Sequence, residues 1–184
     1  MESSTVFAGF GGQGVLSLGK IIASAALAEG REVSWLPSYG PEMRGGTANC
    51  TVVISDRPIG SPVVRSSDVA VVMNIPSCRK FGPLVRPGGI LLVNSTLIPD
   101  ADIPTRQDLR VFRVPATGIA IELGAAIAAN MVMLGAYLAA TGAVSPSVID
   151  SEIEHLFSAK PRALALNRTA VARGLEAAAE AVHA

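Results

Sequence analysis

Short uncharged runs alternate with helix-like segments along this chain. Thr5–Ala8 is β-prone and carries no charge, and Val69–Ile75 and Gly89–Asn94 are runs of the same kind. Strands of this composition are usually covered on both faces, as in a parallel sheet. Glu32–Leu36 and Val111–Val114 are expected to add further strands. The alternation of strands with helices predicts an α/β protein.

One run has a different pattern. From Thr47 to Ile54, apolar residues at every second position alternate with mostly polar ones. Alternation of this kind predicts a strand that is covered on one face only, which is common in antiparallel pairs. We therefore expect a sheet that is mainly parallel and that has room for one antiparallel strand.

The helical segments are unusually apolar. From Val15 to Glu29, the polar residues Ser17, Lys20 and Ser24 fall on one narrow stripe, so this helix is expected to be mostly buried. Helical patterns then dominate the chain from Thr117 to its end. The carboxyl-terminal third is therefore predicted to be helical.

Three helices are predicted in that third. Ala125–Ala140 is rich in Ala and Met and contains Asn130, which needs a hydrogen-bond partner if it is buried, so we expect it to tie the helix to a loop. Ser145 followed by Pro146 has the pattern of a helix cap and a first helical residue. The last helix is expected to begin near Pro161, and its apolar residues form one stripe: Leu164, Val171, Leu175, Ala178 and Val182.

A glycine turn separates the first strand from the first helix. Gly9, Gly11 and Gly14 fit the pattern G-x-G-x-x-G, with Gly12 and Gln13 between them. Such a turn brings backbone N–H groups and a helix amino terminus close to an anion. This unit predicts a single Rossmann-like, three-layer α/β/α domain over residues 1–184, with the turn at the carboxyl end of a strand. Close packing of helix on strand without any ligand is the alternative explanation of the glycines.

A dinucleotide site also requires an acid after the second strand, roughly 20 residues beyond the turn. Here that strand ends in Trp35, Leu36, Pro37 and Ser38, and none of them is acidic. We therefore expect no tight binding of NAD.

The segment from Pro37 to Gly46 is predicted to be a loop because it is rich in turn-forming residues. It carries a concentration of candidate binding groups, for an interface or a ligand: Ser38, Tyr39, Glu42, Arg44, Gly45 and Gly46. Arg44 is suited to bind a carboxylate or a phosphate with two parallel hydrogen bonds. An internal ion pair between Glu42 and Arg44 is the structural alternative.

Composition excludes several classes of protein. Hydrophobic residues make up 49% and charged residues 16%, with a net charge of +0. This apolar composition favours a chain that buries surface against partners, and it gives no electrostatic basis for nucleic-acid binding. We expect a cytoplasmic protein that neither crosses nor binds a membrane.

Catalytic groups are scarce. The 2 cysteines, Cys50 and Cys78, cannot form a four-thiolate cluster by themselves. The 2 histidines, His155 and His183, both lie far from the glycine turn in sequence. We find no nucleophile elbow or zinc-protease motif, so no catalytic residue and no metal ligand is assigned.

Two segments taken together, GFGGQGVLSLGKIIASAA and SYGPEMRGGTANCTVVIS, closely resemble the gamma subunit of the 2-oxoacid:ferredoxin (acceptor) oxidoreductases. The likeness extends over DVAVVMN, PGGILLVNS and NMVMLGAYLAATG, and so over essentially the whole chain. The resemblance implies one subunit of the pyruvate, 2-oxoglutarate or ketoisovalerate enzymes of anaerobic metabolism. Among these substrates 2-oxoglutarate is our first choice.

The resemblance also implies the cofactors and partners. Thiamine diphosphate, Mg²⁺ and [4Fe-4S] clusters are expected in the alpha, beta and delta sister subunits, and none of them is expected to be bound tightly here. The complex converts a 2-oxoacid and coenzyme A (CoA) to acyl-CoA and CO₂ and reduces ferredoxin. The turn residues Gly9, Gly11, Gly12, Gln13 and Gly14 are candidates for contact with a CoA phosphate.

A second hypothesis is an autonomous Rossmann-like enzyme that binds a nucleotide. The missing acid after the second strand favours the subunit. Binding of NAD(H), NADP(H) or CoA by the purified chain alone distinguishes the two.

Overall fold

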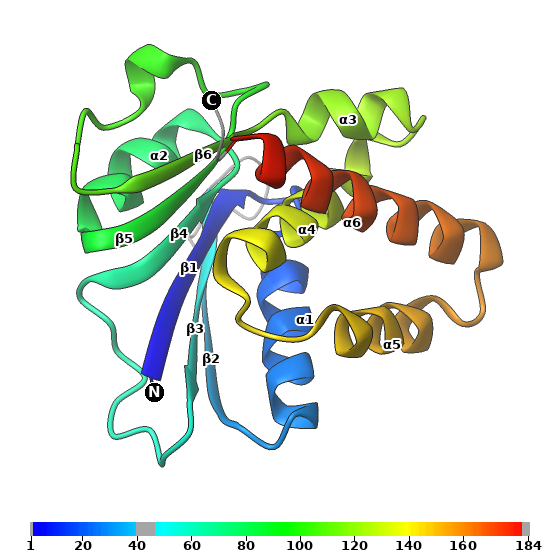
Figure 1. Ribbon diagram of the computed structural model, residues 1–184, viewed down its shortest axis with the longest axis horizontal. Coiled ribbons are helices and arrows are strands. Elements are labelled where there is room, and N and C mark those ends of the chain that lie inside the picture. Colours follow the sequence, from blue (N-terminus) through cyan, green and yellow to red (C-terminus); the bar gives the residue numbers. More distant parts are fainter. Residues whose placement is uncertain (1, 40–46, 182–184) are drawn as a thin grey trace.

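The computed structural model describes residues 2–39 and 47–181, and within them six strands form one sheet in the order β2-β3-β1-β4-β5-β6 (Figure 1). The strands are β1 Glu2–Phe10, β2 Glu32–Tyr39, β3 Thr47–Ser55, β4 Ser67–Val72, β5 Val85–Asn94 and β6 Arg110–Val114. The α-helices are α1 Val15–Ala28, α2 Ile75–Phe81, α3 Ala116–Glu122, α4 Ala129–Thr141, α5 Pro146–Phe157 and α6 Pro161–Ala181.

The sheet is mixed. β1 pairs in parallel with β4, β4 with β5, and β5 with β6, whereas β3 runs antiparallel to both β1 and β2. The antiparallel orientation expected for β3 is thus confirmed. Its coverage on one face only is confirmed near Thr47 but not near its end, where Val53 is 2% exposed.

Helices cover the sheet unequally. α1 and α3 to α6 lie on one face, and α2 lies on the other (Figure 1). From Val69 onward, β4 is uncharged because both of its faces are buried. Val71 belongs to the core beneath α1 and α4, and the next residue, Val72, belongs to a second core with Cys78 of α2. The three-layer α/β/α fold is confirmed.

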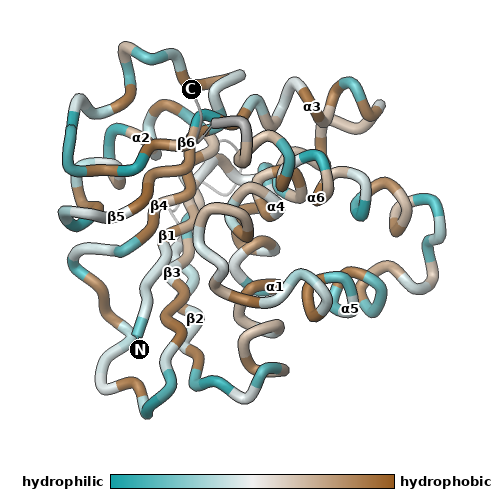
Figure 2. Tube along the Cα trace, in the orientation of Figure 1, coloured by the Kyte–Doolittle hydropathy of each residue, from teal (hydrophilic) through white to brown (hydrophobic). Residues whose placement is uncertain are grey.

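The polar stripe predicted for α1 is present. Ser17 and Lys20 are exposed, whereas Leu18 and Ile22 are almost completely buried. Figure 2 shows hydrophobic residues along the middle of β4 and β5 and hydrophilic ones on stretches of α5 and α6. In the described part of the chain, we find no helix with the length and apolarity that crossing a bilayer requires.

α4 and α6 cross in unusually close contact through two glycines. A Cβ atom on Gly135 would lie 2.9 Å from the backbone nitrogen of Leu175, and one on Gly174 would lie 2.8 Å from the carbonyl carbon of Val132. Both clashes are with backbone, so only glycine permits this approach. The crossing holds the last helix against the buried α4.

Two strand boundaries differ from the sequence expectation. β4 ends at Val72, short of Ile75, because the side chain of Asn74 accepts a hydrogen bond from the N–H of Ser77 (2.9 Å) and caps α2. β2 extends through Pro37 to Tyr39, and so into the segment from Pro37 to Gly46 that its turn-forming residues predict to be a loop. Proline is tolerated there because β2 is an edge strand that pairs only with β3.

One helix start is confirmed and another is corrected. Ser145 precedes α5 as expected, but its side chain caps nothing; its N–H donates instead to Oε1 of Glu29 (2.6 Å). The helix predicted to begin at Ala125 begins at Ala129, after the short 3₁₀ turn Ala126–Ala128.

Candidate functional site

The glycine turn lies at the carboxyl end of β1, as expected for this unit. Gly14 precedes α1 with φ +72°, a left-handed conformation that favours glycine. Gly9 is required for a different reason, since a Cβ atom there would lie 2.8 Å from Oε1 of Gln13 and 3.0 Å from Cβ of Met73. Backbone geometry at one position and close packing at the other therefore fix the turn.

The side chain of Gln13 stabilises this turn through three hydrogen bonds. Its Oε1 accepts hydrogen bonds from the N–H of Phe10 (2.7 Å) and from Nδ2 of Asn74 (3.2 Å). Its Nε2 donates to the carbonyl oxygen of Met73 (3.3 Å). Gln13 thus connects the turn to the end of β4 and holds it in one conformation.

Asn130 supports the turn from the opposite side. It is 8% exposed, and its Nδ2 donates to the carbonyl oxygen of Gly14 (3.4 Å). The prediction that Asn130 ties its helix to a loop is therefore confirmed. A Cβ atom on Gly14 would lie 2.8 Å from Cγ of Asn130, so the two residues fit only with glycine at the turn.

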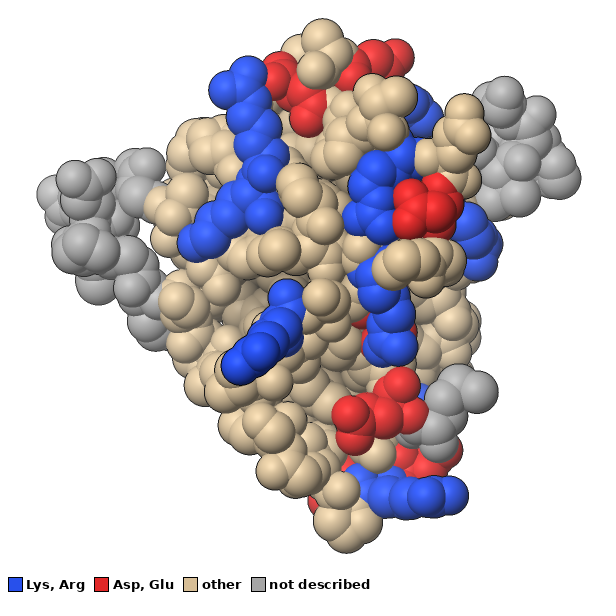
Figure 3. Space-filling model, turned by 90° about the vertical axis from the view of Figure 1, so that its left-hand side faces the viewer, with Lys and Arg blue, Asp and Glu red and all other residues tan. Residues whose placement is uncertain are grey.

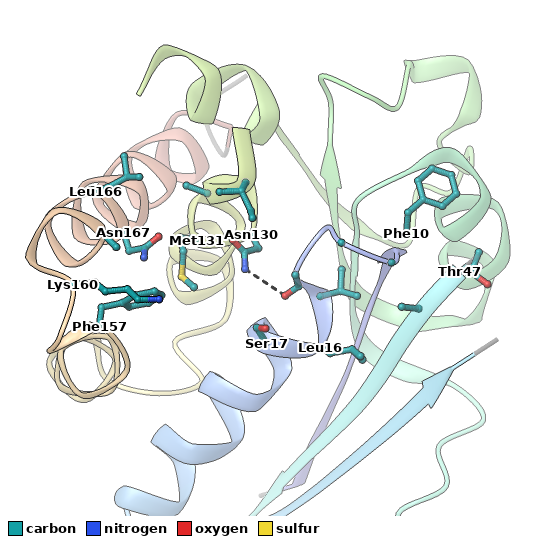
Figure 4. A pocket seen from close by; sticks show the side chains of 18 residues that line it. Phe10, Leu16, Ser17, Thr47, Asn130, Met131, Phe157, Lys160, Leu166 and Asn167 are labelled. Carbon is teal, nitrogen blue, oxygen red and sulfur yellow. Dashed lines mark hydrogen bonds between the residues drawn. The ribbon is translucent and has the colours of Figure 1, made fainter. Parts of the chain in front are cut away.

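A pocket of about 800 Å³ opens beside the turn, between α1, the start of α4 and the junction of α5 with α6 (Figure 4). Most of its wall is apolar, and it includes Met131, Phe157 and Leu166. Its polar side chains are Ser17, Thr47, Asn130, Lys160 and Asn167. Pockets of this size hold small organic ligands, so this is the candidate binding site.

The electrostatics of the pocket favour an anion. α1 begins at its wall with no side-chain cap and no acidic residue in its first turn. The first N–H groups of a helix have no partner within the helix and carry the positive end of its dipole. None of the described residues that line the pocket is acidic.

The structure brings only part of the predicted loop near this pocket. Ser38 and Tyr39 end β2, whereas Glu42, Arg44, Gly45 and Gly46 lie outside the described residues. Tyr39 pairs with Ala48 of β3, and Ala48 pairs with Gly9. Ala48 also lines the pocket, so the start of β3 lies beside the glycine turn, and the end of β2 lies one strand further away.

Sequence reasoning missed two pocket residues, Lys160 and Asn167. Both lie more than a hundred residues from the turn in sequence. Only the packing of α6 against α4 brings them to the pocket. The one feature of the sequence that could have pointed to Asn167 is its position as a polar residue within an apolar helical stripe. The same feature led to the correct prediction for Asn130.

Neither cysteine is prepared for metal binding or nucleophilic attack. Burial raises the pKa of the Cys50 thiol to about 11, and burial also raises that of Cys78 to about 11, so both stay protonated at neutral pH. His155 is exposed on α5 and does not line the pocket. Within residues 2–39 and 47–181, no group of His, Cys, Asp or Glu is arranged to hold a metal ion.

The charged residues over α2 and β5 form ion pairs with one another. Figure 3 shows this face, with basic and acidic side chains interspersed among neutral ones. The pairs are Arg79–Asp102, Arg86–Asp68, Arg106–Asp108 and Arg113–Asp100. Exposed pairs of this kind contribute little to stability.

Comparison with known proteins agrees with the resemblance found in the sequence. The family described as "Pyruvate ferredoxin/flavodoxin oxidoreductase" matches residues 4–177. The chain is 46% identical to the ketoisovalerate oxidoreductase subunit VorA of Methanothermobacter marburgensis over 90% of its own length, but it spans only 34% of that subunit. It is 36% identical to the 2-oxoglutarate synthase subunit KorC of Methanocaldococcus jannaschii, covering 98% of this chain and 96% of that one.

Solved structures have the same fold. A keto/oxoacid ferredoxin oxidoreductase gamma subunit from Geobacter sulfurreducens superimposes with a TM-score of 0.84 at 32% identity, covering 98% of both chains. The pyruvate oxidoreductase subunit PORC of Thermotoga maritima superimposes with a TM-score of 0.78 at 28% identity, covering 95% of this chain and 96% of that one. On this evidence the chain belongs to the pyruvate ferredoxin/flavodoxin oxidoreductase family, as its glycine turn and the SYGPEMRGGTANCTVVIS segment predicted.

Proposed function

We propose that this chain is the gamma subunit of a multisubunit 2-oxoacid:ferredoxin oxidoreductase and that it carries no catalytic centre. The observation that carries the proposal is the chemistry of its pocket. None of the described lining residues is a His, Cys, Asp or Glu, and Lys160 is the one titratable side chain among them. The pocket therefore has the means to bind an anion but no thiol, carboxylate or imidazole for catalysis.

In this proposal, the sister subunits bind the cofactors of the enzyme. The two cysteines are buried and protonated, and the described residues offer no cluster of metal ligands. This chain therefore does not fit a [4Fe-4S] cluster. Thiamine diphosphate, Mg²⁺ and the clusters would be held by the alpha, beta and delta subunits in the cytoplasm, with ferredoxin as electron acceptor.

A CoA phosphate is our proposed ligand for the turn. Gly11, Gly12 and the first residues of α1 line the pocket, and a helix amino terminus stabilises a phosphate through its free N–H groups. Gly9, Gln13 and Gly14 would contribute indirectly, since their contacts fix the turn.

An autonomous dinucleotide-binding enzyme has less support. β3 lies between β1 and β2, which displaces the end of β2 from the turn by a further strand spacing of roughly 5 Å. The expected ribose acid is also missing after β2. Calorimetric titration of the purified chain with NAD(H) tests this alternative, and micromolar affinity would establish it.

The 2-oxoacid is selected in other subunits in this proposal. The full-length likeness to KorC supports 2-oxoglutarate as the first candidate. The 46% identity to VorA supports a branched-chain oxoacid as the second. Comparing kcat/KM of the purified complex for 2-oxoglutarate, pyruvate and ketoisovalerate decides between them.

The isolated chain should be inactive. With any 2-oxoacid and CoA, it should reduce no viologen dye, because its described part holds no group that could break the bond to CO₂ or carry electrons. Activity should appear when the thiamine-bearing and iron–sulfur subunits are added. Dye reduction by the metal-free chain alone would disprove the subunit assignment.

Substitution of Arg44 distinguishes two roles for the segment between β2 and β3. We favour a role in assembly, because that segment leads directly into β3, and Arg44→Ala should then release this chain from the complex on gel filtration. If Arg44 instead binds CoA, the intact complex should show a CoA KM raised about tenfold to a hundredfold, as loss of a charge-assisted hydrogen bond predicts. An intact complex with an unchanged CoA KM would exclude both roles.

A further inference from the structure

The amide of Asn167 has no hydrogen-bond partner among the described residues. Asn167 lies on α6, is 7% exposed, and forms no side-chain hydrogen bond with any residue in 2–39 or 47–181. Its amide atoms stay in contact with solvent, since Ser77 Oγ is the one fully buried side-chain polar atom of the described residues that lacks a hydrogen bond. The amide is therefore free to pair with a ligand that enters the pocket. Asn167 lines the pocket, and Figure 4 shows its amide directed from α6 toward Met131, on the side opposite the glycine turn.

A second polar group on that side is also without a partner. Lys160 lies at the junction of α5 and α6, is exposed, and forms no ion pair with any described residue. Figure 4 shows its ammonium group directed across the pocket toward the first turn of α1, where Ser17 lies. The pocket therefore has a positive charge facing the positive end of a helix, and no described lining residue supplies a negative charge.

The remaining wall is suited to an organic ligand. The lining also includes Met131, Phe157 and Leu166, and Ile127, another lining residue, is 80% exposed. A free inorganic anion would leave this apolar surface in contact with water.

We propose that the pocket binds an organic anion through three contacts. Its charged group lies at the first turn of α1, its body contacts the apolar wall, and an amide or hydroxyl group on that body pairs with Asn167. Lys160 adds attraction for the charge. This inference rests on the anion site proposed above for the glycine turn, and it adds the body of the ligand and the residues that select it.

Four simple probes test the proposal on the purified full-length chain. Inorganic phosphate presents the charge alone, phenyl phosphate adds an apolar body, 4-acetamidophenyl phosphate adds an amide, and 4-acetamidophenol keeps the body without the charge. We expect affinity to rise by about tenfold at each of the first two additions, and the uncharged probe to bind weakest. 4-Acetamidobenzoate, measured alongside, tells whether a carboxylate serves as well as a phosphate.

Variants assign the contacts. Asn167→Leu should reduce the affinity for 4-acetamidophenyl phosphate about tenfold and leave that for inorganic phosphate unchanged. Asn167→Asp, which keeps the shape of the side chain, should weaken both. Lys160→Met should weaken every charged probe, whereas Lys20→Met is the matched control and should weaken none, because Lys20 lies outside the pocket.

Two failures are distinguishable. If inorganic phosphate does not bind, the anion site at the turn is wrong, and this inference with it, while the assignment to the oxidoreductase complex still stands. If phosphate binds but the larger probes bind no better, or if neither Asn167 variant changes their affinity, the turn is an anion site and the pocket is not part of it.

Discussion

Replacing Gly135 or Gly174 by alanine should destabilise the chain by about 3 kcal/mol, at the upper end of what overpacking usually costs. The added methyl group meets backbone atoms of the facing helix, which cannot rotate away as a side chain can. α4 and α6 must therefore separate along their crossing. In a helix, alanine is intrinsically more favourable than glycine by about 1 kcal/mol. A loss of stability on substitution therefore shows that the clash with the facing helix costs more than this gain.

Urea denaturation of the two variants measures this effect, and Gly118→Ala on α3 is the matched control. A Cβ atom on Gly118 would lie 3.4 Å from Oγ1 of Thr96, which is ordinary contact, so this variant should be as stable as the native chain or more stable. If Gly135→Ala behaved like the control, α4 and α6 would not pack as closely as described.

Gly14→Ala should be the most damaging change at the candidate site. Alanine is strained at φ +72°, at a cost of about 1–3 kcal/mol, and its methyl group would displace Asn130 from the carbonyl oxygen of Gly14. We expect the free energy of unfolding to fall by about 3 kcal/mol and phosphate binding to be lost, because the start of α1 moves.

A double-mutant cycle separates the two causes. Asn130→Ala removes Nδ2 and Cγ, the two atoms that lie nearest the new methyl group, and leaves only Cβ at 3.2 Å. The double variant should therefore be more stable than the sum of the single effects predicts. Gly12→Ala is the control for strain alone, since Gly12 has φ +97° and nothing lies within 4 Å of the added atom. Additive effects in the cycle would show that Asn130 and Gly14 are not coupled.

Local chemistry explains which parts of the fold were predictable. The strand before the glycine turn and the helix after it follow from adjacent residues. The thin stripe of Ser17 and Lys20 correctly predicted burial of most of α1, although Leu27 near its end is 58% exposed. Asn130 was predictable because a polar side chain in an apolar helix needs a partner wherever it lies.

The remaining features depend on contacts between distant segments. Ser38 and Tyr39 were predicted to lie in a loop because turn-forming residues surround them, but pairing with β3 keeps both in a strand. Gly135 and Gly174 gave no sign of their role, because a glycine required by a helix crossing resembles any other glycine in the sequence. Lys160 and Asn167 belong to the pocket only because α6 folds back along α4.

The edges of the sheet affect the tendency of separate copies of the chain to aggregate. An exposed edge strand with free N–H and C=O groups invites pairing with another copy and, in time, aggregation. β2, at one edge, contains Pro37, which has no N–H to offer, and begins with Glu32. β6, at the other edge, carries Arg110 and Arg113 within its five residues. Copies of the chain should therefore resist stacking edge to edge into fibrils.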